Sequence, residues 1–265
     1  MHYVNWKWSA PIPDLDGMER SEVAFDGRVL PVYRLGNPEA RFRAVFIHGT
    51  PGSASNFNTQ FRGGIPGAEL VAYERPGFEG NVLRWKQARL RYQVDALFAA
   101  LDGLDPMPTV AVGHSYGGPI ALQAAIERPE VVNAALLVGG SLDPDLEEIY
   151  WVQHMGEIPG VGRALPKSFF SSNRELLRLR RDLIELQRVL RELAVPVTML
   201  HGDQDSLVPI ENVPYLRDEL SRWGKREWMR ESILPGVDHF IPWTHPNELR
   251  AETIRLGDAI ATPIQ

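Results

Sequence analysis

One five-residue stretch, G-H-S-Y-G at residues 113–117, constrains the fold of this chain more than any other. A β-favouring run at 108–112 precedes it, and an Ala-rich helical segment at 118–127 follows it. A serine at a sharp strand-to-helix turn has a strained backbone, and its neighbours two positions away must be small. The two glycines of the stretch meet that requirement. The sequence therefore predicts a turn that exposes Ser115 as a candidate nucleophile.

Short apolar runs alternate with helical segments from about residue 43 onward. Continuous apolar runs are typical of parallel strands that are buried on both faces of a sheet. Besides 108–112, such runs lie at 43–48, 70–74, 134–138 and 196–200. A last strand is expected near 227–234, and helical periodicity marks 88–101, 211–223 and 246–260. Nearer the start, Asp26-Gly27 separates two strand-like runs and indicates a hairpin. The expected fold class is α/β, with a mostly parallel, eight-stranded-type sheet and helices on both faces.

One segment of about fifty residues interrupts the alternation. A structureless loop of that length is uncommon inside a compact domain, so we expect residues 142–194 to form a helical cap. The core would then comprise 1–141, including an irregular N-terminal arm at 1–19, and 195–265. Within the insertion, S-N-R-E at 172–175 has the pattern of a capping box. It predicts a long amphipathic helix over 173–194, with leucines on one side.

An activated serine needs a base, and the base needs an acid to orient it. Asp205 follows a predicted strand, and His239 lies in a loop after the last one. We take these two residues as the candidate acid and base. The alternatives are Asp203, Asp143 or Asp145 as the acid, and His245 as the base.

The reaction also needs donors for the oxyanion that forms on the substrate. The loop at 48–52, H-G-T-P-G, follows a predicted strand and can bring its backbone close to the serine. The candidate donors are the backbone N–H groups of Thr50 and of Tyr116, the residue after the nucleophile.

Taken together, these motifs resemble the α/β-hydrolase superfamily, in its serine-hydrolase branch with a short helical cap. H-G-x-P-G, G-x-S-x-G, G-x-x-D-x-x-V-P and a terminal H-F follow in the family's order over nearly the whole chain. The resemblance implies that the acid is Asp205, because two residues separate it from Val-Pro. The chain departs from the family at 74–81, where it reads E-R-P-G-F-E-G-N and relatives often read D-x-x-G-x-G-x-S.

The expected function is that of a serine hydrolase that cleaves carboxylic esters of small to medium apolar substrates through an acyl-enzyme. Thioesterase, lactonase, amidase or C–C bond hydrolase activity would use the same residues. A catalytically silent ligand-binding protein of this fold is the alternative from another class. The candidate pocket walls, each equally a candidate for core packing, are Phe57, Trp151, Phe169 and Trp243.

The composition of the chain limits the kinds of molecule that it is expected to bind. The net charge of −6 argues against a nucleic-acid partner, and no apolar run approaches the length of a membrane span. The chain has no cysteine, and its histidines lack a second ligand at metal-binding spacing, so we expect neither metal nor cofactor. The expected partner is a small ester-like molecule, with the chain a monomer or homodimer. The first residues lack signal-peptide features, which favours the cytoplasm; secretion or a periplasmic location would require a removed export signal.

Overall fold

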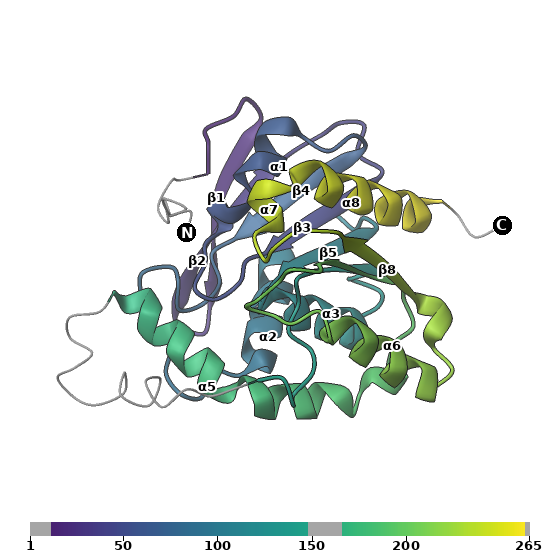
Figure 1. Ribbon diagram of the computed structural model, residues 1–265. Coiled ribbons are helices and arrows are strands. Elements are labelled where there is room, and N and C mark those ends of the chain that lie inside the picture. The colour runs from purple at the N-terminus through teal and green to yellow at the C-terminus, as the bar shows by residue number, and fades with distance from the viewer. Residues whose placement is uncertain (1–11, 148–165, 263–265) are drawn as a thin grey trace.

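A single eight-stranded sheet runs through the computed structural model, which describes residues 12–147 and 166–262 (Figure 1). Its order is β1-β2-β4-β3-β5-β6-β7-β8. β2 runs antiparallel to both of its neighbours, β1 and β4, and the pairs from β4 to β8 are all parallel. The strands are β1 (Met18–Phe25), β2 (Arg28–Leu35), β3 (Phe42–Ile47), β4 (Ala68–Tyr73), β5 (Thr109–His114), β6 (Ala134–Val138), β7 (Val197–Gly202) and β8 (Met229–Leu234). The predicted fold class is confirmed.

The strands form where the apolar runs predict them. Every residue of β3, β4, β5, β6 and β7 is buried, as expected of strands covered on both faces. The hairpin between β1 and β2 turns at Asp26 and Gly27, both with positive φ, as the Asp-Gly pair predicts. These outer strands are partly exposed because only one of their faces meets the core.

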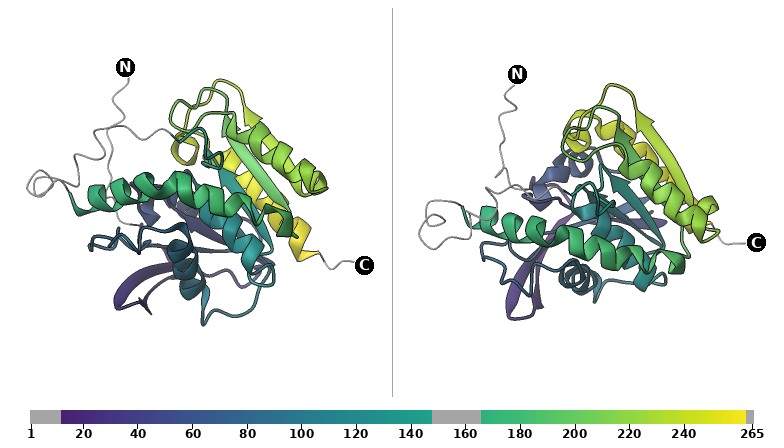
Figure 2. Two further views of the ribbon diagram at one scale, coloured as in Figure 1. Left: turned by 90° about the horizontal axis from the view of Figure 1, so that it is seen from below. Right: turned by 60° about the horizontal axis from the view of Figure 1, so that its bottom comes forward.

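Helices cover both faces of the sheet (Figures 1 and 2). One apolar cluster joins the sheet to α2, α3, α5 and α6, and a second joins it to α1, α7 and α8. The helices are α1 (Asn58–Gly63), α2 (Leu90–Leu101), α3 (Gly117–Glu127), α5 (Lys167–Gln187), α6 (Asn212–Arg222), α7 (Ile241–Thr244) and α8 (Pro246–Ala261). Among the described residues, no helix is both long and apolar enough to cross a bilayer.

The long helix α5 begins earlier than the capping pattern predicts. It starts at Lys167, directly after Pro166, and ends at Gln187. The prediction that it starts after Ser172 is therefore wrong. The physical reason is that the Ser172 hydroxyl accepts a hydrogen bond from Thr50, 122 residues away, and does not cap the helix. The expected N-terminal arm and the first half of the insertion fall largely outside the described residues.

Candidate active site

Ser115 lies at the turn between β5 and α3 with a φ of 55°, in the left-handed region that only one other described non-glycine residue adopts. Its N–H donates to the carbonyl of Val138 at the end of β6, 2.9 Å away. A Cβ added at Gly113 would lie 2.0 Å from the carbonyl oxygen of Gly117, and one at Gly117 would lie 2.2 Å from that of Ile47. The two glycines are thus needed for the close packing that holds the strained serine.

Asp205 and His239 meet at the neighbouring strand ends. Nδ1 of His239 lies 2.7 Å from Oδ2 of Asp205. The other carboxylate oxygen accepts hydrogen bonds from the N–H groups of Leu207 and Val208, at 2.9 and 2.8 Å. Burial raises the pKa of Asp205, but the hydrogen bonds from His239 and Val208 outweigh it, and the pKa lies below its ordinary value. An ionised Asp205 accepts the Nδ1–H of His239, which favours the tautomer in which Nε2 carries no proton.

The alternative acids and the alternative base have other partners. Asp203 accepts a hydrogen bond from the N–H of Gly236 at 2.7 Å, which braces the loop after β8. Asp143 accepts from the N–H of Asp145, whose own side chain pairs with Arg180. His245 lies at the start of α8 and contacts the hydroxyl of Thr244.

The loop after β3 approaches the serine from the other side. A Cβ added at Gly49 would lie 2.9 Å from Cβ of Ser115. The Arg75 N–H donates to Nε2 of His48 at 3.2 Å, so Nδ1 of His48 carries the proton and donates to the carbonyl of Gly49 at 2.9 Å. Burial holds the pKa of His48 well below its usual value, and the charge of Arg75 adds to the effect. This histidine is therefore a neutral brace of its own loop.

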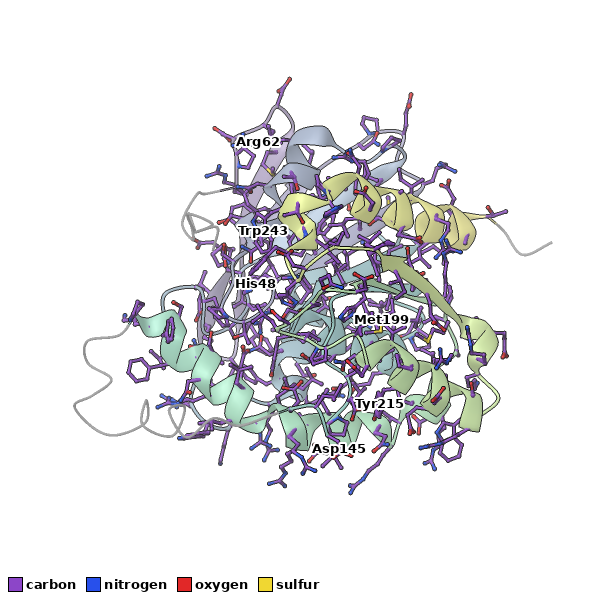
Figure 3. All side chains as sticks on the ribbon, in the orientation of Figure 1. His48, Arg62, Asp145, Met199, Tyr215 and Trp243 are labelled. Carbon is purple, nitrogen blue, oxygen red and sulfur yellow. The ribbon has the colours of Figure 1, made fainter. Side chains whose placement is uncertain are left out.

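A cavity of about 390 Å³ joins these groups. Ser115, His239, Thr50 and Tyr116 all border it. It lies at the carboxyl ends of the parallel strands, where ligands of open α/β sheets bind. In Figure 3, His48 and Trp243 mark this end of the sheet, between α5 and α8. Most of the remaining wall is apolar and comes from α5, α7 and the loops after β7 and β8: Phe169, Leu176, Leu179, Leu207, Val208, Phe240 and Trp243.

The four predicted pocket residues have different locations. Phe169 and Trp243 border the cavity. Phe57 does not, and this is a correction: its side chain is fully buried and packs on Phe46, with ring centroids 4.8 Å apart. The short 3-10 turn Ala54–Phe57 directs it under β3, into the core. Trp151 lies outside the described residues.

The sequence interpretation missed other residues of the wall. The spacing of leucines predicts that Leu176 and Leu179 lie on the apolar side of α5, but it gives no sign that they border a cavity. Glu147 also borders the cavity, and burial raises its pKa to about 7. Nothing in the local sequence distinguishes this glutamate from a surface residue.

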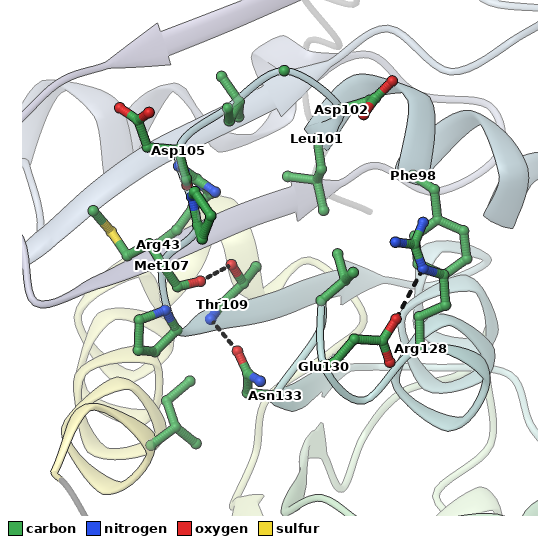
Figure 4. A pocket seen from close by; sticks show the side chains of 16 residues that line it. Arg43, Phe98, Leu101, Asp102, Asp105, Met107, Thr109, Arg128, Glu130 and Asn133 are labelled. Carbon is green, nitrogen blue, oxygen red and sulfur yellow. Dashed lines mark hydrogen bonds and ion pairs between the residues drawn. The ribbon is translucent and has the colours of Figure 1, made fainter.

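A second cavity, of about 600 Å³, lies at the opposite end of the sheet (Figure 4). Both of its arginines are already paired: Arg128 with Glu130 at 3.1 Å, and Arg43 with Glu69 at 2.6 Å. The hydroxyl of Thr109 donates to a backbone carbonyl, and no histidine borders this cavity. Within 12–147 and 166–262, no group of three His, Asp or Glu side chains is arranged to hold a metal ion.

Comparison with known proteins agrees with this geometry. The sequence profile of the Alpha/beta hydrolase family matches residues 44–252, most of the chain. The chain belongs to the α/β-hydrolase family. The α/β-hydrolase fold thus explains why the serine, acid and histidine stretches all lie at strand ends.

Individual relatives of this α/β hydrolase are distant. The mouse sn-1-specific diacylglycerol lipase ABHD11 is 32% identical over 117 residues, which is 43% of this chain and 38% of that protein. Strigolactone esterase D14 from Arabidopsis thaliana is 25% identical over 159 residues, 48% of this chain and 59% of that one. The match thus spans less than two thirds of either relative's length. The structure of haloalkane dehalogenase DbeA from Bradyrhizobium elkani has a TM-score of 0.71 at 16% identity, covering 92% of this chain and 98% of that chain, a likeness of fold alone.

Proposed function

We propose that this α/β hydrolase cleaves carboxylic esters of small to medium apolar substrates, with Ser115 as nucleophile, His239 as base and Asp205 as the orienting acid. The observation that carries the proposal is the 2.7 Å contact between His239 and Asp205 beside the cavity that Ser115 borders. An apolar wall around a few polar groups is the usual character of a small-molecule site. The names of the two curated relatives, a lipase and an esterase, support ester cleavage.

The mechanism follows from the roles of these groups. Nε2 of His239 takes the proton of Ser115 Oγ, which attacks the ester carbonyl carbon. The carbonyl electron pair moves onto oxygen, and the backbone N–H groups of Thr50 and Tyr116 stabilise this oxyanion. The intermediate then expels the alcohol, which takes the proton from His239, and an acyl-enzyme remains. Water repeats the same steps and releases the carboxylic acid.

The first prediction tests the nucleophile. Ser115→Ala should fold normally, because Ala fills the space of Ser, and should lose activity on p-nitrophenyl esters by a factor of about 10⁴–10⁶. The measurement is steady-state turnover beside circular dichroism, with a chain-length series of esters and matched thioesters, lactones and amides.

A fluorophosphonate probe provides the second readout. It should label the parent protein at Ser115 and leave Ser115→Ala unlabelled. Near-normal turnover by the folded variant would contradict the mechanism. A folded parent protein that neither reacts with the probe nor turns over any ester would favour the ligand-binding alternative.

A further inference from the structure

Arg75, the second residue after β4, is a buried cation that the mechanism above does not use. Its side chain has no exposure to solvent. Nε donates to the carbonyl of His48 and Nη2 to the carbonyl of Gly49, both at 2.9 Å. One guanidinium thus holds two successive carbonyls of the loop that carries Thr50.

The partner of Arg75 is a carboxylate on the long helix α5. Nη1 and Nη2 of Arg75 donate to the two carboxylate oxygens of Glu175, at 2.7 and 3.2 Å. Glu175 is also fully buried, and such a two-pronged contact fixes the plane of the guanidinium. One turn earlier on α5, Ser172 accepts a hydrogen bond from the hydroxyl of Thr50 at 3.0 Å. Helix α5 therefore holds the loop at two points.

The same guanidinium also reaches the second candidate oxyanion donor. Its Cζ lies 5.1 Å from the ring centroid of Tyr116 and 4.8 Å from that of Phe78. Both distances are within the range of cation–π contacts. The residues that supply the two candidate N–H donors, Thr50 and Tyr116, are thus both held by contacts that involve Arg75 or its partner helix.

The peptide bond between Gly49 and Thr50 links the carbonyl that Arg75 binds to the N–H that is the candidate oxyanion donor. Its C=O and N–H belong to one planar trans unit and point in opposite directions. By holding the Gly49 carbonyl from one side, Arg75 fixes the direction in which the Thr50 N–H points. A charged donor on the carbonyl also polarises the peptide unit, which strengthens its N–H as a donor.

We propose that Arg75 and Glu175 form a positioning pair that aims and strengthens the Thr50 N–H in the oxyanion hole. The inference rests on the proposed function, because it assigns a role in that reaction. Glu175 provides the countercharge that lets the guanidinium remain buried behind the loop. Helix α5 is thereby part of the catalytic apparatus as well as a wall of the pocket.

The test is a double variant, Arg75→Met with Glu175→Leu. Replacing both members by apolar residues leaves no unpaired buried charge, and such replacements often preserve stability. We expect the free energy of unfolding in urea to stay near that of the parent, while kcat falls about 10²–10³-fold and KM changes little. The affinity for a trifluoromethyl ketone, which forms an oxyanion on Ser115, should fall in parallel with kcat.

A matched control comes from β3 and β4, the strands that precede the Thr50 loop and Arg75. Arg43 and Glu69 are also a buried pair, at 2.6 Å, and Glu69 retains Arg34 as a second partner. Arg43→Met should therefore leave kcat and the affinity for the ketone unchanged. If the double variant at 75 and 175 does not fold, Arg75→Lys carries the test. This variant keeps the positive charge but cannot make all the hydrogen bonds of the planar guanidinium to the loop carbonyls and Glu175. We therefore expect kcat to fall with KM unchanged.

The outcomes separate this inference from the proposed function. Parental kcat and ketone affinity in the folded double variant, or in Arg75→Lys, would overturn the positioning role. So would a loss of kcat that only follows the unfolded fraction. Those results leave the proposed function intact if Ser115→Ala is inactive. An active Ser115→Ala would instead remove the proposed function itself, and with it the basis of this inference.

Discussion

Asp203 and Asp205, which follow β7, have different hydrogen-bond partners. Asp205 contacts the imidazole of His239, whereas Asp203 binds the backbone of Gly236. The family pattern in the sequence already favours Asp205 as the acid, and the contacts add what Asp203 does instead. The backbone donors of Leu207 and Val208 also keep Asp205 ionised, which is what an orienting acid requires.

The second prediction compares these aspartates. Asp205→Asn should lower kcat about 10⁴-fold, because the amide no longer favours the tautomer in which Nε2 is the base. Asp203→Asn should keep kcat within about threefold, since the amide oxygen can still accept from Gly236. Steady-state kinetics on one p-nitrophenyl ester measures both. Equal losses in the two variants would contradict the assignment of the acid.

Glu147 is the carboxyl group that borders the cavity, and burial raises its pKa to about 7, with the charge of Asp143 acting in the same direction. Its side chain is therefore neutral below about pH 7 and anionic above it. A half-buried acid whose pKa is about 7 changes the charge of the pocket as the pH passes through neutrality.

The third prediction concerns the pH dependence of specificity. The kcat/KM of an ester with an anionic acyl group, relative to a neutral ester of similar size, should fall about tenfold as pH rises through 7. Any pH effect that is common to both esters cancels in this ratio. Glu147→Gln should flatten the profile. A ratio that is the same at pH 6 and pH 8 in the parent protein would refute the effect.

Helix α5 both borders the cavity and packs into the core. Near its start, Phe169 and Leu176 border the cavity, and Glu175 holds Arg75. Its later leucines, including Leu183, pack into the core against α2 and α3. The sequence therefore predicts an amphipathic helix here, but not the residues at which it begins and ends. Its apolar stripe follows from the spacing of leucines, whereas the contact of Ser172 with Thr50 is visible only in three dimensions.

The fourth prediction concerns the core half of α5. Leu183→Ala should reduce the free energy of unfolding by about 2–5 kcal/mol, because it removes buried methyl groups and leaves a cavity. Arg181→Ala, at an exposed position two residues earlier, should change it by less than about 0.5 kcal/mol. Urea unfolding of both variants is the measurement. Equal small effects would show that this half of the helix does not stabilise the core.

The strands were more predictable than the pocket. A parallel strand buried on both faces is largely apolar, so its position can be predicted from a run of apolar residues. The serine and acid stretches could be predicted because each follows such a strand, whereas the histidine stretch follows β8, a partly exposed edge strand. Phe57 could not be placed, since a single aromatic residue carries no sign of the direction in which its turn faces. Arg75 and Glu175 lie 100 positions apart, and only the packing of α5 on the sheet brings them together.

The charge of the whole molecule adds a long-range influence on the substrate. The chain carries a formal net charge of −6. Such a charge repels anionic molecules over a distance that shrinks from about 30 Å at 0.01 M salt to about 8 Å at 0.15 M. Association with anionic esters should therefore depend on ionic strength, whereas association with neutral esters should not.

The fifth prediction follows at this scale. Raising the salt concentration from 0.01 to 0.15 M should increase kcat/KM for an anionic ester about two- to threefold, with no change for its neutral counterpart. The experiment is run below pH 7, where Glu147 is neutral and local repulsion is absent. The two esters serve as each other's control. An equal response of both would point to a general salt effect on the enzyme.

The division of the cavity wall has a consequence for how such an enzyme diversifies. The reacting groups come from strand ends within the sheet, while much of the apolar wall comes from α5 and the loops near it. Substitutions at Phe169, Leu176 or Leu179 can therefore alter which molecules are accepted without disturbing the reaction. Glu175, on the same helix, is the exception. A descendant in which another segment replaced α5 would have a different substrate specificity. It would also need another carboxylate to pair with the buried Arg75.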